Sequence, residues 1–379
     1  MRKVLVITGR YLPGYRDGGP VRSVLNLTQW LGDEYDFTIL CHDRDHGDER
    51  PYDGIDPDGF NNVGKARVRY VRSFTAQIIE SLAGSADIVY VCGLYDDYAR
   101  IAMRLKKAGR IRVPVCLAPM GSFSPEAFRI KGFKKRLFVL YMKLSGMFDD
   151  LVFSVTSKRE EEELKAVLGK DADCVIASDL PRQGTTEHTH IKETGSLRLC
   201  FISRIVKKKN LLTVPDILKL TDDNVHIKLD IYGEPEDKDY LHECMARLDD
   251  LRKTHPNCRW EYKGPADSEK VPGIFADYDA FLFPTRGENY GHVIAESLAA
   301  GCIPVISDTT PWLDLGEKGC GYVFPLKDIR AFADTLDLLV QMSEEEMSVI
   351  RDRCCEYIAR VNEISVKDSG YRTLFEKNS

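Results

Sequence analysis

The chain alternates short runs of apolar, β-branched residues with longer amphipathic stretches, and this alternation predicts parallel sheets built from βαβ units. The predicted strands of a first series cover residues 4–8, 37–41, 88–92, 113–118 and 151–156. A second series begins afresh after Ser196 and covers residues 197–203, 226–232, 259–263, 280–284 and 303–307. A length of 379 residues is sufficient for two such domains. The sequence therefore predicts an α/β protein with two Rossmann-like domains, each a doubly wound parallel sheet.

The predicted boundaries follow composition. We assign residues 1–182 to an N-terminal domain, 183–195 to a linker, 196–360 to a C-terminal domain and 361–379 to a C-terminal segment. Packing back on the N-terminal domain is one arrangement open to that last segment. The linker has almost no apolar residue, which suits an exposed connection. Its two histidines, His188 and His190, are expected to be solvated side chains rather than metal ligands.

Composition argues against several classes of protein. The formal net charge of −6, from 53 Lys and Arg against 59 Asp and Glu, gives no general basis for binding nucleic acid. The longest apolar runs, such as residues 137–142, are far shorter than the ~18 residues that a membrane span needs. Eleven cysteines, several of them inside predicted strands, fit free thiols in a reducing cytoplasm. The lack of a CxxC pair gives a structural zinc site little support.

The densest motif lies in residues 281–308, where a buried strand ends at Pro284 and a loop containing Gly287 and Gly291 follows. The pattern then predicts a helix over about 290–300. A loop at a helix N-terminus presents free backbone N–H groups, which makes it an anion site in its own right.

Two glutamates belong to this motif: Glu288 on the loop and Glu296 within the helix. A carboxylate in the loop would repel a bound diphosphate, so Glu288 is better suited to accept hydrogen bonds from the hydroxyls of a sugar joined to that diphosphate. Glu296 stands among apolar residues, and a buried carboxylate requires partners. The alternative for the pair is a helix cap and a solvated helix face; we favour a functional pair.

A second candidate site follows the first strand of the C-terminal domain, over residues 203–210. Arg204 and Lys209 are placed to neutralise a diphosphate, because guanidinium binds phosphate as a fork and ammonium as a point charge. Lys207 and Lys208 are better explained as a solvated helix start. At the N-terminus, Gly18 and Gly19 precede a predicted helix and let another molecule approach the backbone closely.

Together these residues resemble the large family of retaining, nucleotide-sugar-dependent glycosyltransferases with the GT-B architecture, the group that carries a Glu-x7-Glu motif (glycosyl transferases group 1, family 4). The resemblance covers essentially the whole chain and is strongest over residues 203–209 and 283–308. It implies two Rossmann-like domains that face each other across a cleft. The N-terminal domain would bind the acceptor and the C-terminal domain the nucleotide sugar.

The resemblance also implies residue roles. Arg204 and Lys209 would bind the donor diphosphate and Glu288 would contact the transferred sugar, which makes these three the candidate catalytic residues. Glu296 would bind the ribose hydroxyls. The other donor-binding residues implied by the family's loops are Asn289, Tyr290, Gly291, Gly18 and Gly19.

Two departures from the family pattern leave the identity of the sugar open. Met120 stands where the family often has a histidine that touches the sugar, and Thr309 and Thr310 replace glycines. No metal and no other cofactor is expected, because preplaced cations and helix-end amides would stabilise the leaving nucleoside diphosphate. Retention by itself suggests a carboxylate nucleophile. The family resemblance implies front-face attack instead, with Glu288 positioning the sugar.

A narrower similarity, carried by GGPVRS, APMGSFS and SDTTPW, is to enzymes that extend capsular, O-antigen or exopolysaccharide chains. It implies a saccharide or lipid-linked acceptor and a protein of the cytoplasm or of the inner membrane face. Residues 128–143 carry Arg129, Lys131 and further cations, interleaved with apolar residues and without an acid. This stretch predicts either peripheral contact with anionic membrane or a core-packing helix with a solvated edge.

Other functions remain open at this point. An epimerase acting on nucleotide sugars would be favoured if no acceptor were required. A non-catalytic two-lobed nucleotide-sugar sensor would bind donor without hydrolysis or transfer, and the joint presence of the four residues Arg204, Lys209, Glu288 and Glu296 counts against it. A phosphorylase lacks a convincing context for a pyridoxal-phosphate lysine, and a dinucleotide dehydrogenase lacks its glycine fingerprint. The nucleotide base, the sugar, the acceptor and the oligomeric state are not fixed by the sequence.

Overall fold

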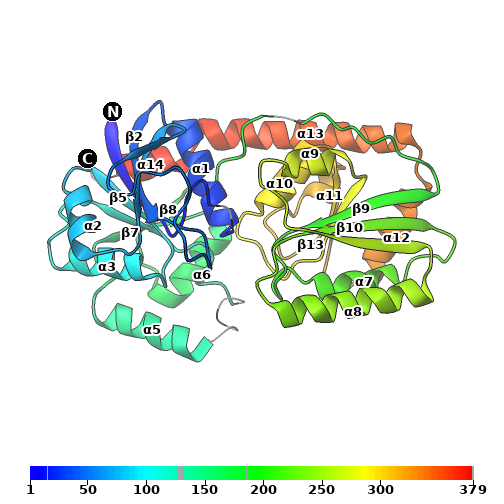
Figure 1. Ribbon diagram of the computed structural model, residues 1–379, viewed down its shortest axis with the longest axis horizontal. Helices are drawn as coiled ribbons and strands as arrows, with labels where there is room; N and C mark the ends of the chain where they lie inside the picture. The colour runs from blue at the N-terminus through cyan, green and yellow to red at the C-terminus, as the bar shows by residue number, and fades with distance from the viewer. Residues whose placement is uncertain (15, 126–127, 129–131, 185, 378–379) are drawn as a thin grey trace. The chain divides into compact units, whose positions relative to one another are not determined.

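A computed structural model describes residues 1–14, 16–125, 128, 132–184 and 186–377. The chain forms two compact units (Figure 1). Residues 1–183 and 364–379 make up the first unit, and residues 184–363 make up the second. The prediction of two parallel-sheet α/β units is confirmed.

The first unit is built on an eight-stranded sheet with the order β3-β4-β2-β1-β5-β6-β7-β8, parallel except for the β3–β4 pair. Its strands are β1 (Arg2–Ile7), β2 (Tyr35–His42), β3 (Asn61–Val63), β4 (Ala66–Val71), β5 (Ile88–Cys92), β6 (Val115–Ala118), β7 (Leu151–Val155) and β8 (Cys174–Ile176). Its helices are α1 (Gly19–Leu31), α2 (Ala76–Ala83), α3 (Asp97–Lys107), α5 (Gly132–Leu144), α6 (Lys158–Leu168) and α14 (Gly370–Glu376).

The second unit is built on a six-stranded parallel sheet with the order β11-β10-β9-β12-β13-β14. Its strands are β9 (Ser196–Ile202), β10 (His226–Tyr232), β11 (Cys258–Gly264), β12 (Ala280–Phe283), β13 (Ile303–Ser307) and β14 (Tyr322–Phe324). Its helices are the 3₁₀ helix η1 (Leu211–Thr213), α7 (Val214–Leu218), α8 (Lys238–Thr254), α9 (Val271–Ala276), α10 (His292–Ala299), α11 (Leu315–Lys318), α12 (Ile329–Gln341) and α13 (Glu344–Lys367). The last residues of helix α13, from Ile364 onward, belong to the first unit.

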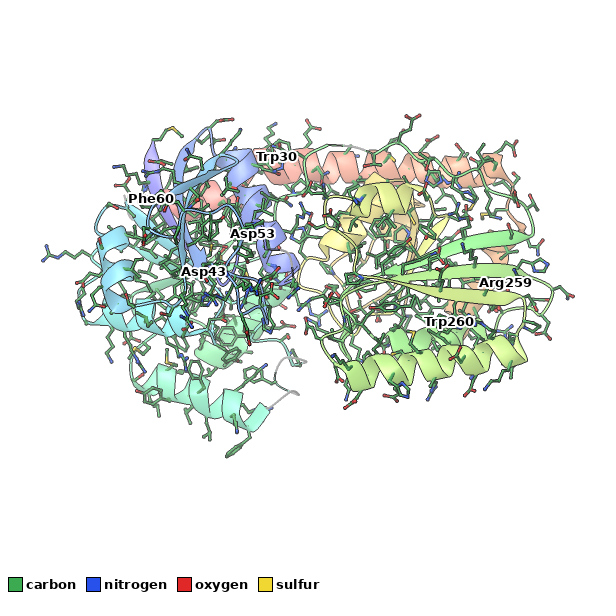
Figure 2. The ribbon with its side chains drawn as sticks, in the orientation of Figure 1. Trp30, Asp43, Asp53, Phe60, Arg259 and Trp260 are labelled. Carbon is green, nitrogen blue, oxygen red and sulfur yellow. The ribbon has the colours of Figure 1, made fainter. Side chains whose placement is uncertain are left out.

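The central strands are continuous apolar runs because helices cover both faces of a parallel sheet. All four residues of β12 are buried, as are all five of β13. Aromatic side chains fill the space between sheet and helices: Figure 2 shows Trp260 on the α8 side of the second sheet, where its indole N–H donates to the Leu248 carbonyl at 2.8 Å. The apolar pattern therefore accounts for the core of each unit.

The segment predicted as an exposed linker is only partly exposed. The backbone N–H of Thr189 donates to the Ala276 carbonyl at 3.0 Å, and Lys192 is buried at 4% exposure. The Lys192 ammonium donates to the Val340 carbonyl at 3.1 Å, and burial lowers its pKa. Thr189 and Lys192 therefore form hydrogen bonds with other parts of the second unit. The polar composition of the segment did not predict these contacts.

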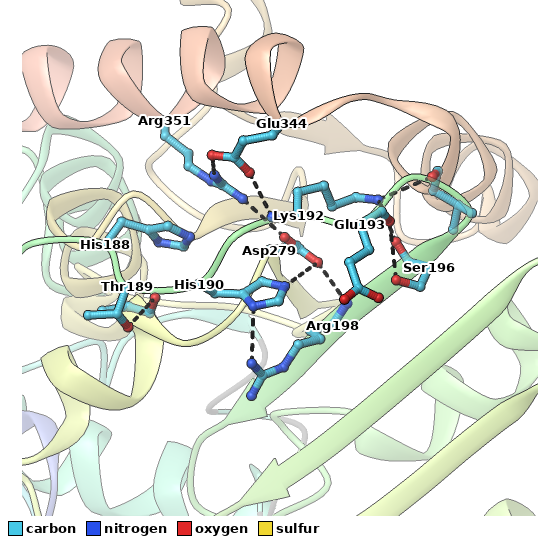
Figure 3. Close-up of polar contacts among 12 residues, drawn as sticks. His188, Thr189, His190, Lys192, Glu193, Ser196, Arg198, Asp279, Glu344 and Arg351 are labelled. Carbon is cyan, nitrogen blue, oxygen red and sulfur yellow. Dashed lines mark hydrogen bonds and ion pairs between the residues drawn. The ribbon is translucent and has the colours of Figure 1, made fainter.

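A buried carboxylate, Asp279, organises this region (Figure 3). It accepts hydrogen bonds from the Arg198 backbone N–H at 2.9 Å and from the Arg351 guanidinium at 3.0 Å. Arg351 also donates to Glu344 at 2.6 Å. His190, predicted to be solvated, lies 3.6 Å from Asp279, and burial lowers its pKa. One acid thereby joins the start of β9, the linker and α13.

Removing Arg351 tests the importance of this network for stability. Arg351→Ala leaves the carboxylate of Asp279, 1% exposed, without its main cation. We expect the unfolding free energy of the second unit to fall by about 3 kcal/mol or more. Arg360→Ala, an exposed position on the same helix, should change it by less than about 0.5 kcal/mol. Urea denaturation followed by tryptophan fluorescence measures both, and equal effects of the two substitutions would contradict this role of Arg351.

Candidate functional site

The predicted site residues of the second unit lie at the point where its strand order reverses. Strands β9, β10 and β11 run outward on one side and β12, β13 and β14 on the other, so β9 and β12 are neighbours. Ligands of open parallel sheets bind at such a switch point, beyond the carboxyl ends of the strands. Arg204 and Lys209 follow β9, and Glu288 follows β12. The topology thus brings two loops that are far apart in sequence to one edge of the sheet.

Lys209 and Glu288 form a direct ion pair in the structure. The Lys209 Nζ atom lies 2.7 Å from each of the two carboxylate oxygens of Glu288. The exposed fractions of the two side chains are 14% and 9%. Burial lowers the pKa of Lys209, and the nearby Glu288 carboxylate partly opposes this shift. The two contacts use two of the three N–H groups of the ammonium, so one N–H remains for a further acceptor.

Two threonines that the sequence analysis did not assign fix Glu288. The Thr285 hydroxyl donates to Glu288 Oε1 at 2.9 Å. The Glu288 backbone N–H donates to the Thr309 carbonyl at 3.3 Å, and the Thr309 hydroxyl donates to the Thr285 carbonyl at 2.8 Å. Thr309 therefore holds the glutamate loop through both its backbone and its side chain. The sequence feature that could have identified Thr285 is its position directly after a strand and Pro284.

Lys209 is held from the other side by its neighbour in the chain. Asn210 adopts a left-handed backbone with φ 61°, and its side-chain amide donates to the Pro284 carbonyl at 2.9 Å. The Arg286 guanidinium donates back to Asn210 Oδ1 at 3.1 and 3.2 Å. These contacts join the β9 loop directly to the β12 loop. Sequence reasoning missed Asn210 and Arg286 because their pairing depends on the packing of separate loops.

Arg204 does not join the Lys209–Glu288 pair. Its guanidinium pairs with Glu236, and the exposed fractions of the two side chains are 38% and 46%. An exposed ion pair contributes only about 0–1 kcal/mol, so an anionic ligand is able to compete for this guanidinium. Gly233 shapes the same edge, since a Cβ atom there would lie 1.7 Å from the Ser203 carbonyl oxygen. Arg204 is therefore near the strand ends but held weakly.

The remaining donor-site candidates surround the start of α10. Gly291 precedes the helix with φ 85°, a left-handed conformation that favours glycine. Trp312 donates its indole N–H to the Tyr290 carbonyl at 2.6 Å and packs against the Tyr290 ring. Asn289 is half-buried on the loop, and Glu296 is half-buried within α10. Glu296 therefore lies about one turn into α10 and not at the ion pair.

In the first unit, Gly18 is the N-cap of α1 and Gly19 is its first residue, and β1, the strand before them, borders the switch point of its own sheet. Gly18 has φ 65°, and a Cβ atom on Gly19 would meet no described atom within 4 Å. Met120 follows β6 with φ 51°, a conformation that is uncommon for a side chain of this kind. The Gly121 N–H beside it donates to the buried Glu160 carboxylate at 2.6 Å. Glu160 thus holds the loop that carries Met120.

Across the residues that the structure describes, no group of three or more His, Cys, Asp or Glu side chains is arranged to hold a metal ion. Of the predicted catalytic residues, the structure joins Lys209 with Glu288, and Arg204 pairs with Glu236 instead. These loops carry two cations, the fixed carboxylate of Glu288 and the N-terminal turn of α10. Cations and helix-end N–H groups suit an anionic group, and a carboxylate suits hydroxyl groups.

Comparison with known proteins finds one matching family and several similar proteins. Residues 185–353 match the family described as glycosyl transferases group 1. Two curated relatives are GDP-mannose:cellobiosyl-diphosphopolyprenol alpha-mannosyltransferases, one from Xanthomonas oryzae pv. oryzae (27% identical over 93 residues) and one from Xanthomonas campestris (31% over 81 residues). These alignments cover 24% and 21% of this chain and the same shares of the relatives. The chain thus spans about a quarter of the length of the curated relatives that it matches.

Similar solved structures cover the whole fold. An E. coli trehalose-6-phosphate structure bound with UDP-2-fluoro glucose has a TM-score of 0.70 at 11% identity, covering 100% of this chain and 99% of that one. Anabaena HepE in complex with UDP and glucose has a TM-score of 0.68 at 14% identity, covering 97% and 99%. The fold is GT-B. The family match covers residues 185–353, which lie in the second unit.

The buried ion pair makes a direct prediction about stability. Lys209→Met leaves the Glu288 carboxylate, 9% exposed, without its cation, and we expect the unfolding free energy of the second unit to fall by about 3 kcal/mol. Lys208→Met, at an exposed neighbouring lysine, should have an effect below about 0.5 kcal/mol.

The double variant Lys209→Met/Glu288→Gln removes both charges, so it should recover much of the loss. Urea denaturation of wild type, Lys209→Met, Glu288→Gln and the double variant measures the coupling between the two side chains. Additive effects in the double variant would contradict the pairing of these two residues.

Proposed function

We propose that the protein is a retaining glycosyltransferase that moves a sugar from a nucleoside-diphosphate sugar to a saccharide or lipid-linked acceptor in cell-surface polysaccharide biosynthesis. The observation that carries this proposal is the Lys209–Glu288 pair at the carboxyl edge of β9 and β12. It places a cation for phosphate directly beside a carboxylate for sugar hydroxyls. A donor of this class has both groups, joined by the bond that is broken.

The main electrostatic requirement of this reaction is stabilisation of the leaving nucleoside diphosphate. Cleavage of the bond between the sugar and the diphosphate leaves negative charge on the departing phosphate oxygen, and preplaced cations stabilise that charge. The remaining N–H of Lys209 and the guanidinium of Arg204 would supply these contacts, and the first turn of α10 would add backbone N–H groups. We propose that these groups act without a catalytic metal.

Glu288 has a positioning role in this mechanism. Its two oxygens are already held by Lys209 and Thr285, and their remaining lone pairs are free to accept hydrogen bonds from sugar hydroxyls. A carboxylate engaged in this way suits sugar positioning better than formation of a covalent sugar ester. We therefore propose front-face attack, in which a leaving phosphate oxygen takes the proton of the acceptor hydroxyl. Glu296 would bind the ribose.

The names of the curated relatives and of the similar structures indicate which donors to test first. The curated relatives are named for GDP-mannose and a diphosphopolyprenol-linked acceptor, and the similar structures hold UDP-2-fluoro glucose or UDP with glucose. We propose a hexosyl donor with one of these two nucleotides. A lipid-linked acceptor would place the reaction in the cytoplasm, at the inner face of the cell membrane. An epimerase or a sugar-nucleotide sensor remains the alternative.

A ligand panel tests donor binding. Thermal unfolding is measured with UDP, GDP, UDP-glucose and GDP-mannose, and the cognate nucleotide should raise the midpoint through mass action, by about 2.7 kcal/mol of stability at a concentration of 100 times its Kd. Lys209→Met should abolish the shift and Lys208→Met should keep it. If none of these four ligands raises the midpoint of the wild-type protein, the proposed donor class is wrong.

Turnover tests the catalytic assignment. Arg204→Ala, Lys209→Ala and Glu288→Gln are each expected to slow release of the nucleotide from the cognate donor at least tenfold, equivalent to about 1.4 kcal/mol of barrier. Lys207→Ala, an exposed neighbour, is the matched control and should turn over normally. Wild-type rates in all three site variants would overturn the assignment. A sensor would bind donor without releasing nucleotide, and an epimerase would alter the sugar without an acceptor.

A further inference from the structure

Helix α5 presents an unusual surface of the first unit. Five of the thirteen large hydrophobic side chains that are exposed among the described residues lie on this one helix. Their exposed fractions range from 50% to 80%. They are Phe133, Leu137, Leu140, Tyr141 and Leu144. Figure 1 shows α5 at the outer margin of the first unit.

These side chains form one continuous stripe. A helix turns by about 100° per residue, so the five positions fall within an arc of about 100°. Val139 and Met142, which are buried at 4% and 3% exposure, lie on the opposite side of the same helix. Both belong to the core cluster that contains residues of β5, β6, β7 and α3. Helix α5 is therefore apolar on two sides, and its core-facing side is already covered.

Cations border the exposed stripe. On the helical wheel Lys134 lies next to one edge of the apolar arc, and Arg136 and Lys143 lie next to the other. All three are exposed. A fourth cation, Lys135, lies over the ring of Tyr95 at 5.1 Å. The helix GFKKRLFVLYMKL contains no acid. Arg129 and Lys131, which the sequence places in the same basic stretch, lie outside the described residues.

The charges beside the stripe favour an anionic bilayer over a second copy of the chain as the partner of this surface. A second copy of the chain, docked stripe to stripe, would bring the three cations that border the stripe against the same three cations of the other copy, and α5 has no acid to compensate. In an anionic bilayer the stripe would contact the apolar acyl chains, and the cations on both sides of it would contact the negative headgroups. This is the geometry of an interfacial helix. Thirteen residues are too few to cross the hydrocarbon core, which needs about 20. Among the described residues, no helix is both long and apolar enough to span a membrane.

We propose that α5 docks the protein on anionic lipid, with its axis parallel to the bilayer surface. Phe133, Leu137 and Leu144 enter the boundary between headgroups and acyl chains, and Tyr141 places its hydroxyl among the headgroups. Lys134, Arg136 and Lys143 then lie at the level of the phosphates. This proposal concerns a surface, so it holds or fails independently of the donor site.

Vesicle co-sedimentation of the full chain tests it. We expect binding to vesicles that contain phosphatidylglycerol and little binding to pure phosphatidylcholine, with weaker binding at physiological ionic strength than at low salt. A stripe variant, Phe133→Ser/Leu137→Ser/Leu144→Ser, should bind at least tenfold more weakly. Its matched control replaces three exposed apolar residues elsewhere, Leu338→Ser/Val349→Ser/Ile364→Ser, and should bind as wild type does.

A second pair of variants tests the charges. Lys134→Glu/Arg136→Glu/Lys143→Glu should lose at least tenfold in binding and most of the salt dependence. Lys158→Glu/Lys238→Glu/Lys327→Glu makes the same change in net charge at exposed positions away from α5 and should keep at least half of the binding. Equal losses in the two triple variants would show that net charge matters and α5 does not.

Three results would overturn the proposal. One is wild-type protein that ignores phosphatidylglycerol vesicles at low salt. Another is vesicle binding that survives both α5 variants. The third is a wild-type dimer in light scattering that the stripe variant converts to a monomer, since the stripe would then be covered by a second copy. The thermal unfolding midpoints of the α5 variants, measured without ligand, should lie close to that of wild type. This control shows that the variants are folded and does not depend on the proposed function.

Discussion

Strands β9 and β12 pair side by side in parallel, although β10 and β11 lie between them in the chain. The Lys209–Glu288 ion pair depends on this pairing. Because parallel strands end at the same edge, the loops after β9 and β12 must meet there, and each contributes one member of the ion pair. The contacts of Asn210 with Pro284 and Arg286 then fix the distance between the loops. A shift of either strand would separate Lys209 from Glu288.

The ion pair has a cost that its surroundings offset. Removing an ammonium and a carboxylate from water is unfavourable, and burial accordingly lowers the pKa of Lys209. Two 2.7 Å contacts and the hydroxyl of Thr285 recover part of that free energy. The pair that remains is rigid but not saturated, with one lysine N–H and several carboxylate lone pairs unused. Arg204, in contrast, sits in an exposed and weak pair, so the site combines one fixed cation with one that is free to reorient.

The sequence predicted those parts of the fold and site that depend on local pattern. Apolar runs located most of the central strands, and glycine with flanking polarity located the loop of Glu288. It did not predict the three-residue strands β3, β8 and β14, whose edge positions leave too few apolar residues to form a pattern. It also did not predict the partner of Arg204 or the burial of Lys192. The partner of Arg204 and the burial of Lys192 both depend on which elements are neighbours in space. The polar composition of each segment does not indicate those neighbours.

The protein has a negative net charge, whereas the two proposed binding sites carry positive side chains. The short range of electrostatic forces in salt solution explains how both can hold. A chain of net charge −6 would on average repel both a nucleoside diphosphate and an anionic bilayer. At physiological ionic strength, however, exposed charges more than about 8 Å apart are largely screened from each other. The cations of the β9 loop and those of α5 therefore act on whatever lies next to them, and distant acids matter little. What decides binding is the local arrangement: one buried ammonium with an unused N–H, and one helix whose three exposed cations border an apolar stripe.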